Sequence, residues 1–520
     1  MIARRSLWVV GNSYLGAALG YVALLAMARY MGAELLGSRA YVLAIVFLMG
    51  IVTRLGLPTT HARRLARGDD VAGSNGTYWA IKVGLTAAFL ALAGGGMWIW
   101  FHVLDRTVFD ATEQALWLGI AVVFVKSLRD VCTNTFRGLE RIRRRESVLF
   151  TNTVTTVLLT VLVAIAVAES RGRWAPAPGF ADTVAAWFGV TGPVGFDQAL
   201  AWLIGAYLAG EIASFALALV LWATARIPVG APSLAIAKDY ANASLPIMVV
   251  TIAGLLMRRV DQIMVGFWHD ATELGQYAAA TKLSEVVMLL ALGVHVVLLP
   301  IVARLQQEGR MEALAESLRD TERWISLLVW PVVVMGWLIA TPILHIVLSD
   351  DFLPAATVLM MLLVHSLVNS ITIPLRTKAL GLGKQNTAAK FATAAVVVNI
   401  AANFLLVPKY GAFGAAIATV LAGLLMLFLY RRKAHEWIGH PILPTHLWKH
   451  AAAGGATYAL LRWAPLPEVL RFYDLVWYGT LVLTTYVGIL MLLGGLRRDD
   501  IGRLRRMVGN AKTGTEVDGP

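Results

Sequence analysis

The sequence is built from apolar runs about twenty residues long, separated by short polar connectors rich in glycine and proline. A helix needs a run of this length to cross the hydrocarbon core of a bilayer, which is about 30 Å thick. Only helices and closed barrels satisfy all backbone hydrogen bonds in lipid, and long unbroken apolar runs indicate helices. We therefore predict an all-α polytopic membrane protein with about 14 transmembrane helices. The predicted spans cover residues 6–28, 38–59, 78–101, 113–136, 147–168, 197–223, 241–267, 282–303, 324–348, 354–376, 387–407, 412–431, 447–463 and 474–495.

The composition supports this class. Hydrophobic residues make up 58% of the 520 residues and charged residues 15%, whereas soluble domains carry about 25% charged residues. The net charge of +13 could indicate a nucleic-acid-binding protein, but the basic residues lie in the connectors, beside anionic lipid headgroups. We expect the bilayer, and no nucleic acid, as the partner of this charge. The single cysteine, Cys132, excludes a disulfide framework and a CxxC metal site, and we expect no cofactor.

The basic residues also predict the orientation in the membrane. About 31 of the 45 Lys and Arg residues lie at the termini and in one set of alternate connectors, and about 9 lie in the opposite set. Cytoplasmic connectors carry the excess of basic residues. We expect a multi-pass protein of the inner (cytoplasmic) membrane with both termini in the cytoplasm. The first apolar run lacks a clear cleavage site, so we expect it to remain as a span.

Two connectors share a short pattern in which Glu-Leu precedes a glycine, Gly37 in the first case and Gly275 in the second. Their separation, 275 minus 37 or 238 residues, is the offset expected if two groups of six spans form two lobes related by an axis normal to the membrane. A substrate site is expected between such lobes. The predicted domains are an N-terminal six-helix lobe (1–225), a C-terminal six-helix lobe (226–432), two additional helices (433–496) and a cytoplasmic basic tail (497–520).

Charged side chains inside spans are costly unless they face protein, water or an opposite charge, so they are the candidates for function. Basic residues predominate there, and we select Arg54, Lys126, Arg129, Arg258 and Arg259, with Arg29 at the outer end of the first span. The acidic residues Glu211 and Asp261 are candidates for ion coupling, which needs a group that exchanges a proton or sodium within the membrane.

Each candidate also has a purely structural interpretation. Arg258 can pair with Asp261, and Lys282 with Glu285, because both pairs have i, i+3 helical spacing. Glu211 could neutralise Lys126 or Arg129 of the same predicted lobe. Lys82 lies near the cytoplasmic end of its span and is expected to extend toward the interface. The apolar residues of the connector 304–323 recur at helical spacing, which is typical of an amphipathic helix on the cytoplasmic surface or, more simply, of a solvated connector helix.

Several segments resemble the polysaccharide-exporting branch of the multidrug/oligosaccharidyl-lipid/polysaccharide flippase superfamily. The clearest is residues 399–416, where Asn399 and Asn403 precede an apolar run and a Pro-x-x-Gly-x-x-Gly-Ala-Ala turn. Other similar segments are residues 28–32, 259–263, 275–283, 299–309 and 380–384. The resemblance reaches to about residue 432. It implies a V-shaped, two-lobed transporter that moves a lipid-linked sugar from the cytoplasmic to the outer leaflet by alternating access, with a polyprenyl phosphate or diphosphate as the carrier.

We therefore predict a flippase for a polyprenyl-linked oligosaccharide or repeat unit that serves cell-surface polysaccharide assembly. The basic residues selected above would contact the phosphate headgroup, because Arg matches phosphate oxygens with a fork of donors. We expect a monomer that works with polysaccharide assembly proteins. The alternatives are a membrane-embedded glycan polymerase or ligase, an ion-coupled multidrug exporter and a peptidoglycan lipid precursor flippase. The last two are disfavoured, because the first span contains no acidic residue and residues 28–34 lack the Arg-Asp pair of the peptidoglycan branch.

Overall fold

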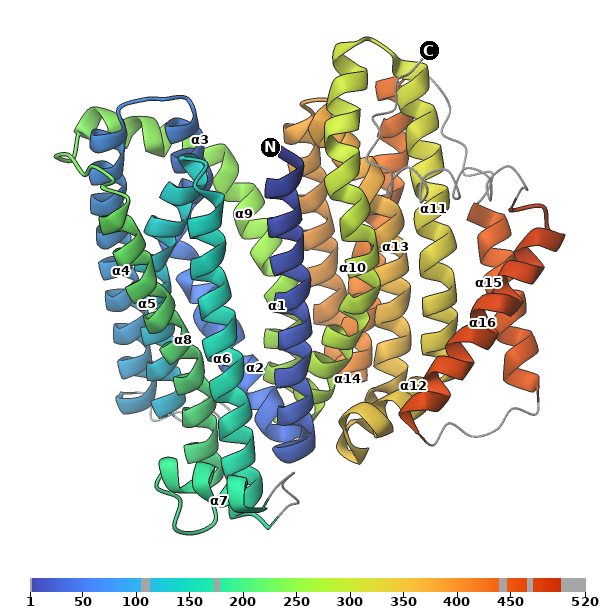
Figure 1. Ribbon diagram of the computed structural model, residues 1–520, viewed down its shortest axis with the longest axis horizontal. Coiled ribbons are helices and arrows are strands. Elements are labelled where there is room, and N and C mark those ends of the chain that lie inside the picture. Colours follow the sequence, from blue (N-terminus) through green and yellow to red (C-terminus); the bar gives the residue numbers. More distant parts are fainter. Residues whose placement is uncertain (1, 104–112, 173–177, 439–446, 465–470, 497–520) are drawn as a thin grey trace. The chain divides into compact units, whose positions relative to one another are not determined.

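The computed structural model describes residues 2–103, 113–172, 178–438, 447–464 and 471–496. All regular secondary structure in these ranges is helical (Figure 1). In chain order the elements are α1 (Ile2–Tyr30), α2 (Gly32–Met49), η1 (Gly50–Thr53), α3 (Leu57–Ala66), α4 (Val71–His102), α5 (Glu113–Gly138), α6 (Ile142–Ser170), α7 (Pro178–Trp187), α8 (Phe196–Thr224), α9 (Leu234–Trp268), α10 (Ala271–Gln307), α11 (Met311–Leu338), α12 (Ala340–Ile343), η2 (Leu344–Leu348), η3 (Asp350–Ala355), α13 (Ala356–Gly381), α14 (Gln385–Ile438), α15 (Leu447–Trp463) and α16 (Phe472–Leu492).

The helices confirm an all-α polytopic membrane protein. Among the described residues, eight helices are long and apolar enough to cross a bilayer, or ten if each of two bent pairs counts as one span. One bent pair joins Met311–Leu338 to Ala340–Leu348 at an angle of 82°, whereas the apolar run 324–348 predicts one continuous span. The count of 14 spans and the arrangement in two lobes stay predictions.

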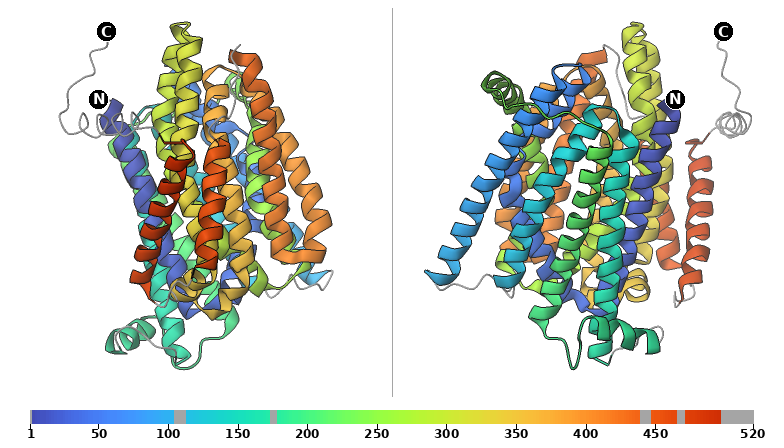
Figure 2. Two further views of the ribbon diagram at one scale, coloured as in Figure 1. Left: turned by 90° about the vertical axis from the view of Figure 1, so that its right-hand side faces the viewer. Right: turned by 60° about the vertical axis from the view of Figure 1, so that its left-hand side comes forward.

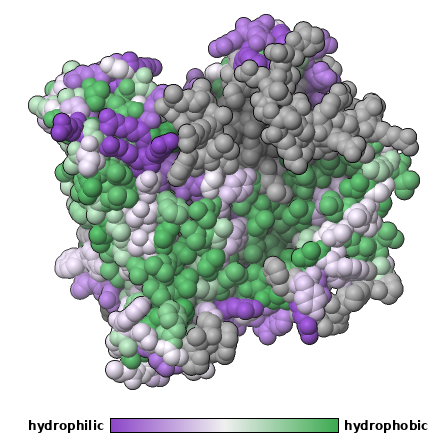
Figure 3. Space-filling model, viewed as in Figure 1, coloured by the Kyte–Doolittle hydropathy of each residue, from purple (hydrophilic) through white to green (hydrophobic). Residues whose placement is uncertain are grey.

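The structure divides into two compact units. Unit 1 contains Met1–Glu285, Val347–Leu362 and Gln385–Met426, and unit 2 contains Val286–Ile346, Leu363–Lys384 and Leu427–Pro520. The lobe boundaries expected at residues 225 and 432 stay predictions. On unit 1, the face drawn in Figure 3 is hydrophobic over the middle of α6 and α8 and hydrophilic at the end near α3. Leu158 of α6 and Val220 of α8 are exposed, as expected of side chains that face lipid.

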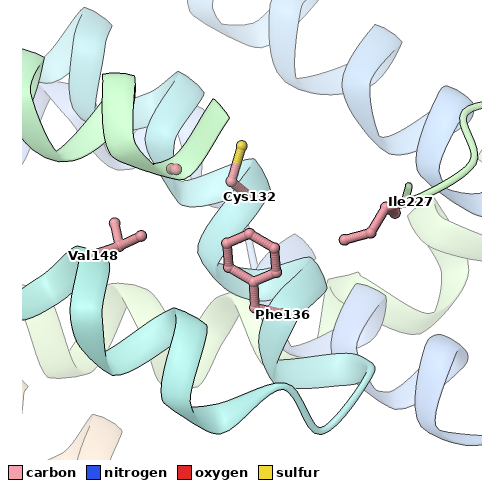
Figure 4. Close-up of a cluster of buried hydrophobic side chains, with 5 residues drawn as sticks. Cys132, Phe136, Val148 and Ile227 are labelled. Atoms are coloured by element: carbon pink, nitrogen blue, oxygen red, sulfur yellow. The ribbon is translucent and has the colours of Figure 1, made fainter. Parts of the chain in front are cut away.

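Packing inside unit 1 is apolar where α5, α6 and α8 meet. Cys132 and Phe136 of α5 are buried with Val148 of α6, Ala218 of α8 and Ile227 (Figure 4). Cys132 therefore serves as a small apolar side chain in a packed cluster.

Two glycines hold α2 and α10 in backbone contact. A Cβ atom on Gly37 would overlap the carbonyl oxygen of Ala271, and a Cβ atom on Gly275 would overlap the carbonyl oxygen of Ala33. The two contacts are reciprocal. Ala271 follows Ala33 by 238 residues (271 minus 33), and Gly275 follows Gly37 by the same number (275 minus 37). Small residues allow membrane helices to approach this closely.

The turn expected between the eleventh and twelfth spans is present within α14. Gly411 has φ 53° and ψ −135°, which interrupts the helix, and a Cβ atom on Gly414 would lie 2.6 Å from the carbonyl oxygen of Leu406. Gly411 therefore separates two helical halves of α14 (orange in Figure 2). Glu273 Oε1 accepts a hydrogen bond from the Ala412 amide at 2.7 Å and so holds this turn against the start of α10.

Residues 304–323 do not form the single connector helix that their helical spacing predicts. In unit 2, α10 continues to Gln307, the chain turns at Gly309 with φ 68°, and α11 begins at Met311. Leu314 and Leu318 are buried against Leu305. Their helical spacing reflects packing within this helical hairpin and not contact with the membrane surface.

Candidate functional site

A cavity of about 350 Å³ lies inside unit 1 between α1, α2, α6, α8, α9 and α10. The wall formed by α1 is apolar, the wall formed by α2, α9 and α10 carries cations, and the wall formed by α6 and α8 carries neutral polar groups. The lining residues are Gly20, Ala23, Leu24, Met27, Leu36, Arg39, Ala40, Leu43, Asn152, Thr153, Thr156, Val157, Thr160, Tyr207, Arg259, Gln262, Ala278 and Lys282.

Two arginines dominate the cationic wall. Arg259 Nη1 donates to Gln262 Oε1 at 3.1 Å, and its guanidinium group lies 5.2 Å from the centre of the Phe47 ring. Arg39 Nε is buried without a hydrogen-bond partner. In the part of the chain that the structure describes, neither arginine forms an ion pair with a carboxylate. The cavity therefore holds two positive charges that an anionic ligand could neutralise.

The third cation of this wall is already paired. Lys282 Nζ lies 2.6 Å from Glu285 Oε2, which confirms the i, i+3 pair expected from the sequence. The ammonium group also lies 5.7 Å from the centre of the Tyr21 ring. Lys282 consequently adds less net charge to the cavity than the two arginines.

Arg39 is not among the site residues predicted from the sequence. The predicted second span began at residue 38, which placed Arg39 at its outer end, whereas α2 begins at Gly32. The missed signal was the apolar residues before Arg39, which continue the same helix. With six more residues in the helix, Arg39 lies well inside the element.

The two other predicted arginines near this region do not line the cavity. Arg258 is adjacent to Arg259 but exposed, as expected for neighbouring helical positions about 100° apart. Arg29 near the end of α1 is also exposed. Their roles as headgroup contacts stay predictions.

A second charged cluster joins α5 to α8. Arg129 lies 2.7 Å from Glu211 and 3.1 Å from Asp130, and Lys126 lies 3.4 Å from Glu211. These contacts confirm that Glu211 pairs with both basic residues. Glu211 and Arg129 are buried, so this network resembles the buried ion pairs that fix helices to each other.

Arg54 occupies the edge of the same cluster. Its guanidinium group lies 3.9 Å from Asp130, and its side chain is 36% exposed. Together with Lys126 and Ser127 it lines a polar pocket of about 10 Å³. Arg54 is therefore less completely paired than Arg129.

Lys82 does not extend to the interface as expected. Its side chain is fully buried, and Nζ donates to the Thr53 carbonyl oxygen at 2.7 Å. Thr53 ends the short 3₁₀ turn η1, and carbonyl groups at a helix end lack intrahelical partners. Lys82 supplies the missing donor.

Asp261 lies in a buried cluster of neutral donors. Its carboxylate accepts hydrogen bonds from Tyr277 at 2.9 Å, Asn403 at 2.7 Å and Thr419 at 2.5 Å. The predicted ion pair with Arg258 is not formed among the described residues. Asn399, one turn before Asn403, is buried beside the same carboxylate. The Asn-x(3)-Asn spacing therefore directs two amides to one face of α14 beside this carboxylate.

Comparisons with known proteins agree with the fold. A family model described as "Polysaccharide biosynthesis protein" matches residues 197–357. The chain is 22% identical over 312 residues to the probable low-salt glycan biosynthesis flippase Agl15 of Haloferax volcanii, covering 59% of this chain and 64% of that protein. It is 24% identical over 201 residues to the uncharacterized membrane protein MJ1068 of Methanocaldococcus jannaschii, covering 37% and 39%. The matched part thus spans less than two thirds of either relative.

Solved structures show the same architecture. The lipid II flippase MurJ in an inward closed conformation has a TM-score of 0.71 at 15% identity, covering 93% of this chain and 98% of MurJ. An inward-facing multidrug resistance MATE family transporter has a TM-score of 0.59 at 14% identity, covering 81% and 95%. The chain therefore shares the fold of these two transporters. The resemblance drawn from the sequence motifs is thereby confirmed.

Proposed function

We propose that this protein is a flippase that moves a polyprenyl phosphate- or diphosphate-linked oligosaccharide from the cytoplasmic to the outer leaflet for cell-surface polysaccharide assembly. The observation that supports the proposal is the cavity of unit 1, in which Arg39 and Arg259 have no carboxylate partner among the described residues. A charged headgroup cannot cross hydrocarbon alone, because each unpaired charge there costs several kcal/mol.

The cavity matches a diphosphate better than a cationic drug. A diphosphate carries about two negative charges, and a guanidinium group binds phosphate oxygens with two parallel hydrogen bonds. The described lining contains no Asp or Glu, whereas an exporter of cationic drugs would need acidic groups in its cavity. No covalent bond changes in this proposal, since transport needs only alternating access to the two leaflets.

The remaining basic residues take secondary roles in the proposal. Arg54 and Lys126 can contact the headgroup at another depth, because Arg54 is partly exposed beside the small polar pocket. Arg129 orients these side chains through Glu211 and Asp130. Arg258 and Arg29 contact the headgroup at entry or release.

Asp261 is the preferred ion-coupling residue. Its carboxylate is surrounded by neutral oxygen and nitrogen groups that can accommodate a proton or sodium. Glu211 is held by Lys126 and Arg129, and binding another cation there would require breaking both pairs. We therefore assign Glu211 a structural role.

Two other functions remain as alternatives. A peptidoglycan lipid precursor flippase is favoured by the similarity to the MurJ fold, although residues 28–34 lack the motif expected of that branch. A glycan polymerase or ligase would need catalytic acid or base groups on an outer loop. The outer connector contains the helix α7, whose ten residues include one acidic residue, Asp182.

The test expresses single variants in a host strain from which the wild-type gene has been deleted. Arg39→Gln and Arg259→Gln should each reduce surface polysaccharide about tenfold or more and cause lipid-linked oligosaccharide to accumulate in the cytoplasmic leaflet, because each removes a charge-assisted contact. Arg54→Ala and Arg258→Ala should have smaller effects of the same sign. The control is Arg63→Gln, which changes an exposed arginine of α3 outside the cavity.

The amount and thermal stability of each variant in the membrane separate a transport defect from misfolding. Full restoration of surface polysaccharide by the Arg39→Gln/Arg259→Gln double variant would refute the proposal. Drug efflux by the wild-type protein without any change in lipid-linked sugar would favour a multidrug exporter. In the same assay, Asp261→Asn should abolish the dependence of transport on the ion gradient, and unchanged dependence would refute the coupling assignment.

A further inference from the structure

The cavity has a neutral polar wall on α6 and α8 besides its cations, and the flippase proposal alone gives this wall no role. Asn152, Thr156 and Thr160 of α6 recur every four residues, so they lie along one face of the helix over about 12 Å. Tyr207 of α8 extends the same wall. All four residues line the cavity.

Part of this wall is fixed by packing between α6 and α8. Asn152 Nδ2 donates to Ser214 Oγ at 3.4 Å, which leaves Oδ1 without a donor in the described part of the chain. The Thr156 hydroxyl packs directly against Gly210, where any Cβ atom would overlap it. The wall is therefore a preformed surface and not a set of mobile side chains.

Thr160 provides the second observation that points to a ligand. Its side chain is 1% exposed, and its Oγ1 atom has no hydrogen-bond partner among the described residues. Buried hydroxyl groups in proteins are nearly always hydrogen-bonded, because an unsatisfied group costs about 1–3 kcal/mol. A ligand with hydroxyl or amide groups would satisfy Thr160 together with Asn152 Oδ1 and the Tyr207 hydroxyl.

We propose that this α6–α8 wall binds the first sugar of the cargo, the sugar joined directly to the phosphate. The inference rests on the proposed flippase function and adds the class of sugar. The wall contains neither a carboxylate for an amino sugar nor a cation for a uronic acid, so it fits an uncharged hexose or N-acetylhexosamine. A volume of about 350 Å³ is near the lower end of ligand pockets, about 300–1,000 Å³, and therefore accommodates the headgroup and one sugar.

The consequence is a division of recognition within the cavity. Arg39 and Arg259 bind the phosphate groups, which every cargo shares, whereas α6 and Tyr207 distinguish the proximal sugar. Sugars further along the oligosaccharide lie outside this cavity and are not selected by it.

The test measures the affinity of the purified full-length protein for three soluble probes. These are farnesyl diphosphate, farnesyl diphospho-glucose and farnesyl diphospho-N-acetylglucosamine. Thr160→Val keeps the shape of the side chain and removes its hydroxyl, so it should weaken binding of a sugar-bearing probe about fivefold and leave farnesyl diphosphate unchanged. Tyr207→Phe should have the same selective effect and serves as a second variant if Thr160→Val fails to fold.

Matched controls identify which proposal fails. Thr155→Val alters the same helix at a position outside the cavity lining and should change neither affinity, and Arg259→Gln should weaken all three probes. If the wild type binds farnesyl diphosphate but neither sugar increases the affinity, or if Thr160→Val and Tyr207→Phe both lack a selective effect, the sugar assignment alone is refuted. If the wild type binds none of the probes, the flippase proposal and the sugar assignment both fail.

Discussion

The same residue type has opposite environments inside unit 1. Arg129 is buried between Glu211 and Asp130, so its charge is compensated within the protein. Arg39 has a buried nitrogen without a partner and faces the cavity. Its charge is therefore available to a ligand, and only the positions of neighbouring helices create this difference.

His61 of α3 shows how a titratable group outside the spans is held neutral. Nδ1 lies 2.6 Å from the Tyr240 hydroxyl, Nε2 lies 2.8 Å from Thr135 Oγ1, and the ring stacks on Tyr78 at 3.9 Å. Burial, and secondarily the positive charge of Arg137, lowers the pKa of His61 to about 3. The Thr135 hydroxyl donates to the Val131 carbonyl oxygen, so it accepts from Nε2, and Nδ1 accepts from the Tyr240 hydroxyl. Protonation of Nδ1 would prevent this second bond in its present direction.

This pKa predicts a stability loss at acidic pH. The unfolded chain binds a proton at His61 near pH 6.5, whereas the folded protein does so only near pH 3. The stabilisation is thus complete above pH 6.5 and is lost as the pH falls toward 3. The thermal unfolding temperature of purified protein should decrease over this range, and His61→Gln should reduce that pH dependence. His102→Gln, at an exposed position of α4, should keep the wild-type dependence, and an identical dependence in His61→Gln would contradict the prediction.

At the scale of elements, α2 and α10 cross in direct backbone contact. Gly37 and Gly275 allow each backbone to lie against the other, with the Gly275 amide nitrogen 2.6 Å from a Cβ atom built on Gly37. Arg39 and Ala278, which line the cavity, follow within one turn of these glycines. The crossing therefore sets the distance between two walls of the cavity.

Added methyl groups at this crossing should separate the helices. Gly37→Ala and Gly275→Ala should each lower the free energy of unfolding by about 1–3 kcal/mol, because the backbone contact leaves no room for a Cβ atom. Gly84→Ala in α4 and Gly205→Ala in α8 meet no atom within 4 Å, so these controls should keep or raise stability. Thermal unfolding in detergent measures both effects, and equal stability of all four variants would contradict the close crossing.

At the scale of the whole molecule, the distribution of basic residues predicts the orientation of the chain. About 31 of 45 Lys and Arg residues lie in the termini and connectors that are predicted to face the cytoplasm. The connector that carries Arg67 is predicted to face the cytoplasm, and the connector that carries Gly192 is predicted to face outward. Both positions are exposed.

Cysteine labelling tests this orientation. In a Cys132→Ala background, Gly192→Cys should react with a membrane-impermeant maleimide in intact cells, and Arg67→Cys should react only after the membrane is opened. Glycine at position 192 has no atom within 4 Å of an added Cβ, so the substitution should not disturb folding. The reverse labelling pattern would show that the termini face outward.

The sequence by itself determined the membrane class, the helix-forming segments and the turn at Gly411, because these depend on hydrophobic length and local backbone preference. Spacing along single helices also identified the pair of Lys282 with Glu285. Only the tertiary structure decided that Lys82 is buried, that Arg39 and Arg259 share a cavity, and that Asp261 contacts Asn403 and not Arg258. These outcomes depend on which faces of helices far apart in the sequence pack together. The position of a residue along its own helix does not determine its neighbours on another helix.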